Sequence, residues 1–229
     1  MMPTPTVIAI DGPSASGKSS TAAAVAAQLD MIHVDTGALY RALTWLALER
    51  GLEDAAAIVD AADAGSLHLT PRDRRLIVVA GENEDDIEEG IRSERVTAGV
   101  SAVAAMPEIR SWVNRRLRVA VRASGGAVLD GRDIGTVVFP DAALKVFLTA
   151  SAEARARRRL VQRGGAPEPE EVRLEAELLA ARDRVDAARK EAPLRQGHDA
   201  ILVDTTDMSF EAQVARIVEL ARDRGLPLG

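Results

Sequence analysis

A glycine-rich loop near the N-terminus constrains this chain more than any other feature. An apolar run at residues 7–11 leads into the loop at residues 12–20, and an alanine-rich helical pattern follows. A strand, a Gly-x-x-x-x-Gly-Lys-Ser loop and a helix, in that order, are typical of a phosphate-binding loop. Glycines let the backbone turn so that its N–H groups face phosphate oxygens, and the helix adds its positive N-terminal end. We therefore expect an α/β domain that binds a nucleotide.

The loop also carries the side chains that nucleotide chemistry requires. Lys18 can reach the β- and γ-phosphates of ATP, and the hydroxyl of Ser19 can ligate Mg²⁺. The expected ATP-binding residues of the loop are Gly12, Pro13, Ser14, Ala15, Ser16, Gly17, Lys18, Ser19 and Ser20. Asp11, Asp130 and Asp204 end expected strands, and any of the three could assist Mg²⁺ through water. The alternative interpretation is an ordinary glycine–serine turn before a helix.

Composition excludes several other classes of protein. The 229 residues contain no cysteine, which removes disulfides, thiolate metal sites and cysteine nucleophiles. The net charge of −6 argues against a broad nucleic-acid surface. No apolar stretch reaches about 18 residues, and the first six residues lack a basic segment, so we expect neither a membrane span nor a signal peptide. The expected compartment is the cytoplasm.

Almost all basic residues of this chain are arginines. Only Lys18, Lys145 and Lys190 are lysines among 29 basic residues, so the position of an arginine, and not the number of arginines, carries an argument. The three histidines, His33, His68 and His198, are scattered without metal-ligand spacing, and we assign them no role.

The pattern of apolar runs predicts the fold class. Buried strands are expected at residues 7–11, 31–35, 127–130, 144–148 and 201–204. Helical patterns separate them, at residues 18–29, 38–50, 54–64, 93–105, 107–123, 152–162, about 170–190 and 210–222. The sequence therefore predicts an α/β fold with a five-stranded, mostly parallel sheet and helices on both faces.

One segment interrupts this alternation. Residues 67–70 and 76–79 are short strand candidates around a charged turn, and the acidic stretch 81–89 has the composition of a loop. We interpret residues 66–91 as a small insertion with its own antiparallel strands.

Several motifs together resemble the bacterial cytidylate kinase family, in order and over nearly the whole chain. Beside the phosphate loop they are Asp35-Thr36-Gly37-Ala38-Leu39-Tyr40-Arg41, Val100-Ser101-Ala102-Val103-Ala104 with Ile109-Arg110, Asp130-Gly131-Arg132-Asp133-Ile134-Gly135-Thr136, and Arg182-Asp183-x-x-Asp186-x-x-Arg189. The resemblance implies the nucleoside-monophosphate (NMP) kinase fold. It implies a core at 1–65 and 124–229 with a lid at about 160–172, and an NMP-binding insertion at 66–123. It also implies transfer of the γ-phosphoryl group of ATP, as MgATP, to CMP or dCMP.

The resemblance implies site residues as well. Lys18, Arg41, Arg132 and Arg189 are the expected catalytic residues, and Arg158 is expected on the ATP side. The cytosine contacts would be Ser101, Arg110 and Asp133, and Arg182 with Asp186 would bind the ribose. The full set implied for CMP is Thr36, Tyr40, Arg41, Ser101, Arg110, Arg132, Asp133, Arg182, Asp186 and Arg189. Alternatives stay open for Tyr40, as an ordinary interior tyrosine, and for Arg155, Arg158 and Arg159, as a solvated basic helix face.

These residue types suit the implied chemistry. Two polyanionic nucleotides repel each other, so dispersed positive charge is the main catalytic requirement. A phosphate acceptor is already an anion at neutral pH, and no general base is needed. A carboxylate accepts from the N4 amino group of cytosine, and an arginine donates to N3 and O2, whereas uracil mismatches both contacts.

Other functions remain as alternatives. Within the same class, the runner-up is a kinase that prefers UMP or another small phosphorylated acceptor. A GTPase or ATPase switch predicts an Asn-Lys-x-Asp motif, which this chain lacks. A non-catalytic nucleotide-binding protein fits poorly with Lys18, Ser19 and the arginine set. We expect ATP and CMP or dCMP as the partners, no nucleic acid or membrane, and a monomer.

Overall fold

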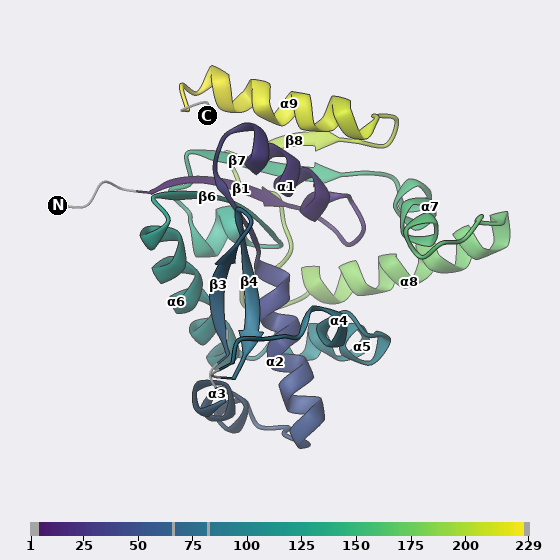
Figure 1. Cartoon of the computed structure of the whole chain (residues 1–229). Helices are drawn as coiled ribbons and strands as arrows, with labels where there is room; N and C mark the ends of the chain where they lie inside the picture. The colour runs from purple at the N-terminus through teal and green to yellow at the C-terminus, as the bar shows by residue number, and fades with distance from the viewer. Residues whose placement is uncertain (1–4, 66, 82, 227–229) are drawn as a thin grey trace. The chain divides into compact units, whose positions relative to one another are not determined.

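The computed structural model describes residues 5–65, 67–81 and 83–226 (Figure 1). Outside the described residues lie Ser66, where the insertion was expected to begin, Glu82 in the acidic stretch, and Met1–Thr4, on which the signal-peptide prediction partly rests. The chain divides into two compact units. The first is built mainly from Ile32–Ala127, and the second from Thr6–Met31 and the chain from Val128 onward.

The second unit contains a four-stranded sheet. Its strand order is β6 (Gly126–Gly131), β1 (Thr6–Asp11), β7 (Leu144–Thr149) and β8 (Ile201–Asp204). β7 is parallel to both β1 and β8. α1 (Lys18–Gln28) and α9 (Phe210–Asp223) pack together against the sheet. Aliphatic side chains of these strands and helices, with almost no aromatic residue, form one buried core.

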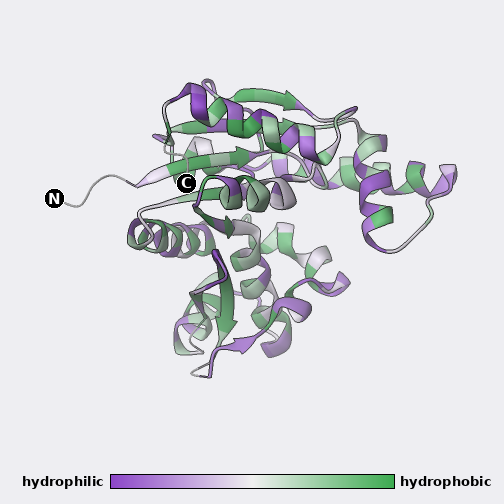
Figure 2. Ribbon diagram, turned by 45° about the horizontal axis from the view of Figure 1, so that its top comes forward, coloured by the Kyte–Doolittle hydropathy of each residue, from purple (hydrophilic) through white to green (hydrophobic). Residues whose placement is uncertain are grey.

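A helical hairpin extends from the same unit. α7 (Ala152–Gln162) and α8 (Pro169–Ala187) pack on each other around a small apolar cluster of Ala156, Val172, Ala176 and Leu179. Ser151 caps α7 by accepting the N–H of Ala154, and α8 begins with a capping box. Hydrophilic and hydrophobic residues alternate along the hairpin (Figure 2), and Val161, Leu174, Leu178 and Val185 are exposed.

The first unit joins a small sheet to several helices. Its strands are β2 (Ile32–Asp35), β3 (His68–Arg72), β4 (Arg75–Ala80) and β5 (Asp85–Asp86). β4 is parallel to β2 and antiparallel to β3 and β5. The helices of the first unit are α2 (Thr36–Arg50), α3 (Ala55–Ala64), α4 (Glu88–Ile91), α5 (Glu94–Val103) and α6 (Pro107–Ala123). α2 contacts each of the other four.

The predicted α/β class with a mostly parallel sheet is confirmed, with some differences in detail. All five predicted strands are present, and the antiparallel pair β3–β4 is present as well. β4 also pairs with β2, so the insertion strands join one of the five predicted strands within the first unit. The prediction of a loop at 81–89 was wrong in part, because β5 pairs with β4 and α4 begins at Glu88, where Ile87 and Ile91 are buried.

Two further observations concern a turn that the sequence did not predict and the apolar character of the helices. A π-helical turn, η1 (Ile134–Val138), follows β6 and contacts β1. Within the described part of the chain, no helix combines the length and apolar character that crossing a membrane requires.

Candidate functional site

The phosphate loop runs between β1 and α1 and has little room for side chains at its start. Gly12 has φ of 154°, and a Cβ atom there would lie 2.0 Å from the carbonyl oxygen of Leu148 on β7. Gly17 has φ of 90° and occupies the N-cap position of α1 without a side-chain cap. The first N–H groups of α1 thus have no capping side chain, which suits an anion at this end of the helix.

Lys18 is buried inside the loop that precedes it. Its ammonium group donates to the carbonyl oxygen of Pro13 at 2.6 Å and to the Ser16 hydroxyl at 3.3 Å. Burial lowers the pKa of Lys18 well below its usual value, and the Arg132 guanidinium lowers it further, although Asp130, Asp183 and Asp11 oppose this. A bound polyphosphate would supply the negative charge that keeps this lysine protonated.

The hydroxyl of Ser19 and the carboxylate of Asp130 are hydrogen-bonded at 2.5 Å. Both are hard oxygen donors, and Mg²⁺ in phosphoryl-transfer sites is held by few protein oxygens beside phosphates and waters. Of the three aspartates that the sequence left open, Asp130 is the one bonded to Ser19. Asp11 accepts two backbone N–H groups, and Asp204 accepts from Thr206. Among the described residues, no group of three or more His, Cys, Asp or Glu side chains could hold a metal alone.

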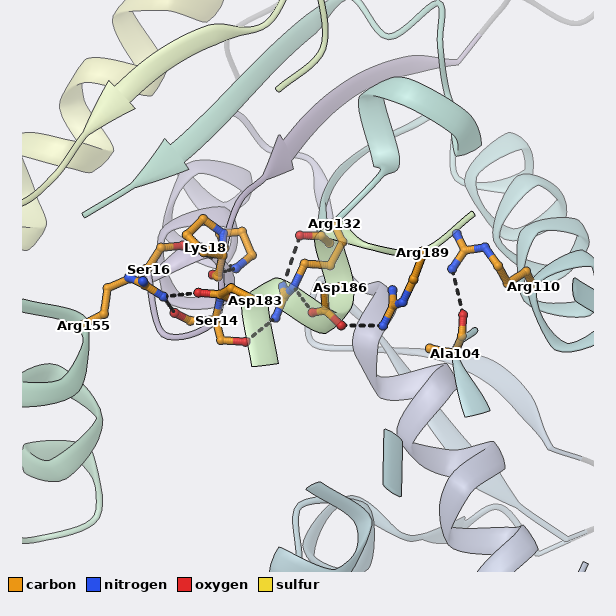
Figure 3. Close-up of polar contacts among 12 residues, drawn as sticks. Ser14, Ser16, Lys18, Ala104, Arg110, Arg132, Arg155, Asp183, Asp186 and Arg189 are labelled. Atoms are coloured by element: carbon orange, nitrogen blue, oxygen red, sulfur yellow. Dashed lines mark hydrogen bonds and ion pairs between the residues drawn. The ribbon is translucent and has the colours of Figure 1, made fainter. Parts of the chain in front are cut away.

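Two of the predicted acceptor arginines share one carboxylate (Figure 3). The Nε of Arg132 donates to Asp186 at 3.2 Å, and Arg189 donates to the other oxygen of Asp186 at 2.5 Å. The Nη2 of Arg132 also donates to the Ser14 hydroxyl at 3.0 Å, within the phosphate loop. The structure therefore brings a predicted CMP-binding arginine into direct contact with the predicted ATP-binding loop.

Asp133 lies beside this cluster on a short segment that β1 holds in place. Asp133 is buried at 4% exposure, and the next two N–H groups, of Ile134 and Gly135, donate to the two carboxylate oxygens of Asp11 at 2.8 Å each. A Cβ atom at Gly135 would lie 3.1 Å from the Lys145 side chain, so only glycine packs here without displacement. Asp11 thus ties the segment that carries Arg132 and Asp133 to the strand that leads into the phosphate loop.

We expect Asp11 to make stability depend on pH. Burial raises the pKa of Asp11 from 3.8 to about 6, although the N–H groups of Gly135 and Ile134 lower it. A raised pKa favours the protonated form of the folded protein. This contribution to stability is complete below pH 3.8 and is lost as pH rises through 6. The wild type should therefore lose stability relative to the Asp11→Asn variant as pH rises. The difference between their free energies of unfolding should fall by about 1 kcal/mol between pH 5 and pH 7.5.

Denaturant titrations at several pH values measure this difference. Asp204→Asn is the control, because Asp204 also accepts a backbone N–H, from Thr206, but is exposed, and its hydrogen bonds with Thr206 lower its pKa. Its difference from the wild type should be flat over the same range. A flat difference for Asp11→Asn would contradict the raised pKa.

Arg182, another predicted CMP residue, lies on α8 of the second unit, and the first unit carries the other five on three helices. Arg41 on α2 donates to the Thr97 hydroxyl of α5 at 2.9 Å and to the carbonyl oxygen of Ile91 at 3.4 Å. Arg110 on α6 is buried, donates to the carbonyl oxygen of Ala104 at 3.1 Å, and lies over the ring of Tyr40, 5.5 Å from its centroid. Tyr40 is therefore packed against a second predicted site residue.

The two remaining residues of this set lie at the ends of the same elements. Thr36 is buried at the start of α2, where Asp35 caps the helix. Ser101 lies one helical turn after Thr97 on α5. It therefore shares a helix face with Thr97, which accepts the hydrogen bond from Arg41.

Three of the four arginines of α7, namely Arg155, Arg158 and Arg159, do not form a solvated face. Arg155 donates to the carbonyl oxygen of Ser14 and to Asp183, Arg158 donates to the hydroxyl and carbonyl oxygens of Thr205, and Arg159 pairs with Glu175 at 2.9 Å. A pocket of ≈ 410 Å³ lies against this helix and the phosphate loop. It is lined by Ala15, Gly17, Ser20, Arg158, Arg159, Gln162, Met208, Phe210 and Gln213.

Sequence reasoning assigned no role to several residues at these sites. Asp183 and Arg155 contact the phosphate loop, and Gln213 packs against Gly17 and donates to Thr21 at 2.8 Å. Asp183 lies inside the Arg-Asp-x-x-Asp-x-x-Arg motif, and this position could have indicated a role for it. Gln213 had none, because its contacts depend on how α9 packs on α1.

Comparison with known proteins decides the family. The profile of the cytidylate kinase family matches residues 8–223. The chain belongs to the cytidylate kinase family. It is 44% identical over 219 residues to a cytidylate kinase of Geobacillus kaustophilus, covering 95% of this chain and 96% of that protein. It is 43% identical over 222 residues to a cytidylate kinase of Streptomyces avermitilis, covering 95% and 93%.

Two other matches are a longer bifunctional protein and a solved structure of low sequence identity. A bifunctional pantoate ligase/cytidylate kinase of a Synechococcus species is 48% identical over 223 residues, which are 94% of this chain but 40% of that protein. Among solved structures, an uncharacterized protein from Eubacterium ventriosum matches with a TM-score of 0.50 at 12% identity, covering 96% of this chain and 99% of that one. At that identity the likeness concerns the fold alone.

Proposed function

We propose that this cytidylate kinase family member transfers the γ-phosphoryl group of ATP to CMP or dCMP, giving ADP and CDP or dCDP. One observation carries the proposal beyond family membership. Arg132, expected to bind the acceptor phosphate, donates to Ser14 inside the phosphate loop, whose lysine is buried and poised for a polyanion. Donor-binding and acceptor-binding groups are thus in hydrogen-bond contact within one compact unit.

The donor side consists of the phosphate loop and one arginine beside it. Residues 12–20 hold the ATP phosphates through backbone N–H groups and the Lys18 ammonium, and Arg158, which lines the pocket, contacts ATP. Ser19 and Asp130 are the residues that would hold Mg²⁺, which neutralises phosphate charge when bound. Lys18 stabilises the charge that develops on the transferred group.

The acceptor side is built from arginines and carboxylates. Arg41, Arg132 and Arg189 bind the phosphate of CMP, because planar guanidinium groups match phosphate oxygens. Arg182 and Asp186 bind the ribose. The base and its surroundings involve Asp133, Arg110, Ser101, Thr36 and Tyr40.

Asp133 is the residue proposed to select cytosine. Its carboxylate accepts from the N4 amino group, whereas the O4 atom of uracil offers no proton there. Its burial limits competition from water, so water does not replace the contact that a mismatched base loses.

Two segments take the roles that the family resemblance implies. Residues 66–123 form the NMP-binding insertion, and residues at about 160–172, which include the loop between α7 and α8, form the lid. Lid closure would exclude water from the reacting phosphates and limit wasteful hydrolysis of ATP. The cytoplasmic compartment and the monomeric state stay predictions from the sequence.

A panel of nucleoside monophosphates with ATP and Mg²⁺ tests the proposal together with one variant. The wild type should phosphorylate CMP or dCMP in preference to UMP. Asp133→Ala should lower kcat/KM for CMP about 100-fold, since one base contact is worth about 1–3 kcal/mol, while the Kd for ATP stays within threefold. Asp141→Ala, in an exposed loop of the same unit, is the control.

Three results would contradict the proposal. Equal turnover of CMP by Asp133→Ala and the wild type would remove the role of Asp133. A preference of the wild type for UMP would assign a different acceptor. Strong ATP hydrolysis without any acceptor would indicate a nucleotide switch.

A further inference from the structure

The backbone of Ser14 is held at both its N–H and its carbonyl group by two residues outside the phosphate loop (Figure 3). Its N–H donates to Oδ1 of Asp183 at 2.8 Å, and its carbonyl oxygen accepts from Nη1 of Arg155 at 2.9 Å. The same Nη1 donates to Oδ2 of Asp183 at 2.5 Å, which closes a ring of three interactions. Ser14 itself is 2% exposed, so water has little access to these backbone groups.

Both partners are themselves fixed in place. The Nε of Arg155 donates to the carbonyl oxygen of Ala150 at 3.1 Å, just after β7, and Arg155 lies in the first turn of α7. The Arg155 and Asp183 side chains are 9% and 16% exposed, so the ion pair is largely removed from solvent. Charge-assisted hydrogen bonds in such surroundings are stronger and more directional than exposed ones.

Asp183 also connects the loop to the proposed acceptor residues. On α8 it lies directly after Arg182 and three residues before Asp186. Asp186 accepts hydrogen bonds from Arg132 and Arg189, and Arg132 also donates to the Ser14 hydroxyl. Ser14 is therefore bonded to α7 and α8 through its backbone and to an acceptor arginine through its side chain.

We propose that Asp183 and Arg155 are positioning residues that fix the backbone of Ser14 at both of its peptide groups, and thereby hold the phosphate loop in register with the acceptor-binding residues of α8. This inference rests on the proposed function, because it assigns the donor to the loop and the acceptor to Arg132, Asp186 and Arg189. Neither residue needs to touch a nucleotide. The Ser14 N–H is occupied by Asp183, so its contribution to ATP binding is the shape of the loop.

The alternative is that the pair only stabilises the α7–α8 hairpin, and the chain offers a matched control for it. Glu175 on α8 pairs with Arg159 at 2.9 Å and with Arg163 at 3.2 Å, and its side chain is 9% exposed. It is a buried ionic link between the same two hairpin segments, and the side chains that bond to Ser14 are those of Asp183, Arg155 and Arg132. Loss of hairpin stability alone should therefore follow equally from Asp183→Asn and Glu175→Gln.

The first measurement is steady-state kinetics with CMP and ATP. Asp183→Asn should lower kcat about 10- to 30-fold with both KM values within threefold, since misalignment of bound groups slows the chemical step more than it weakens binding. Glu175→Gln should keep kcat within twofold despite a comparable drop in melting temperature. The double variant Asp183→Asn/Arg155→Met should be no slower than the worse single variant, because both residues hold the backbone of Ser14 and pair with each other.

The second measurement does not depend on activity. Hydrogen exchange of the phosphate-loop amides, without nucleotide, should be at least tenfold faster in Asp183→Asn and unchanged in Glu175→Gln. Equal kcat losses in the two variants, or unchanged exchange in Asp183→Asn, would overturn the inference. If the wild type did not phosphorylate CMP, the proposed function would be contradicted instead. The exchange comparison would still test whether Asp183 and Arg155 fix the backbone of Ser14.

Discussion

Replacing Lys18 by methionine should lower kcat for CMP phosphorylation about a thousandfold. The ammonium group is the cation that the phosphate loop encloses, bonded to Pro13 and Ser16. Removing one preorganised charge from a site where phosphate charge develops costs about 100- to 1000-fold, and more where few other cations compensate. Methionine keeps most of the side-chain volume, so the loop itself should keep its fold.

Stability separates this effect from misfolding. Burial makes the charged form of Lys18 costly in the free protein, which is why its pKa is lowered. Lys18→Met should therefore melt at a temperature no lower than the wild type, although turnover is nearly lost. Single-turnover kinetics and thermal melting of the same preparation measure both quantities.

Lys145→Met is the matched control. Lys145 is the other buried lysine of this unit, and its ammonium group pairs with the exposed Asp199 at 2.8 Å. Its aliphatic stem packs against Gly135, and methionine preserves most of that contact. We expect its kcat to stay within about threefold of the wild type, as charge loss at this position leaves the nucleotides untouched. A retained rate in Lys18→Met, or equal losses in both variants, would mean that the loop lysine is only structural.

Replacing Gly12 by alanine should abolish nucleotide binding and destabilise the protein. The added Cβ atom would lie 2.0 Å from the Leu148 carbonyl oxygen, and that neighbour is backbone in the middle of a sheet. Neither the loop nor β7 can relax without breaking strand pairing, so we expect a loss of about 2–4 kcal/mol of stability. The Kd for ATP should rise at least a thousandfold, because the displaced loop no longer directs its N–H groups inward.

Gly125→Ala separates the clash from backbone strain. Gly125 also has a positive φ, 76°, but a Cβ atom there would meet no atom within 4 Å. Alanine at this position should cost only about 1 kcal/mol and leave the Kd for ATP unchanged. Urea titration and calorimetric ATP binding of both variants make the comparison. Equal behaviour of the two variants would show that the close approach to Leu148 is not what requires glycine at position 12.

Local features of the fold were predictable because their causes are close together in sequence. The alternation of apolar strands and helices predicted β1, α1, β2, β6, β7 and β8, and the glycines of the phosphate loop predicted its turn. The prediction failed at residues 81–89. There the acidic composition is typical of a loop, but pairing of Asp85 and Asp86 with β4 forms a short strand. Pairing partners supplied by another strand override local propensity.

The π-helical turn η1 illustrates the same limit at the site. Nothing in residues 134–138 alone indicates it. The N–H groups of Ile134 and Gly135 bond to Asp11, more than 120 residues away, and this contact fixes where the segment turns.

The phosphate loop and the α/β class follow from the order of the residues along the chain, because glycine conformation, helix ends and charge are local properties. The arginines expected to bind two nucleotides came from the resemblance to cytidylate kinases and stay a prediction. Which carboxylate and which guanidinium hold the loop depends on contacts between distant parts of the chain. The bond between Ser14 and Asp183 joins residues 169 positions apart. A contact of that kind exists only after the strands and the α7–α8 hairpin have packed, because no local preference of the chain specifies it.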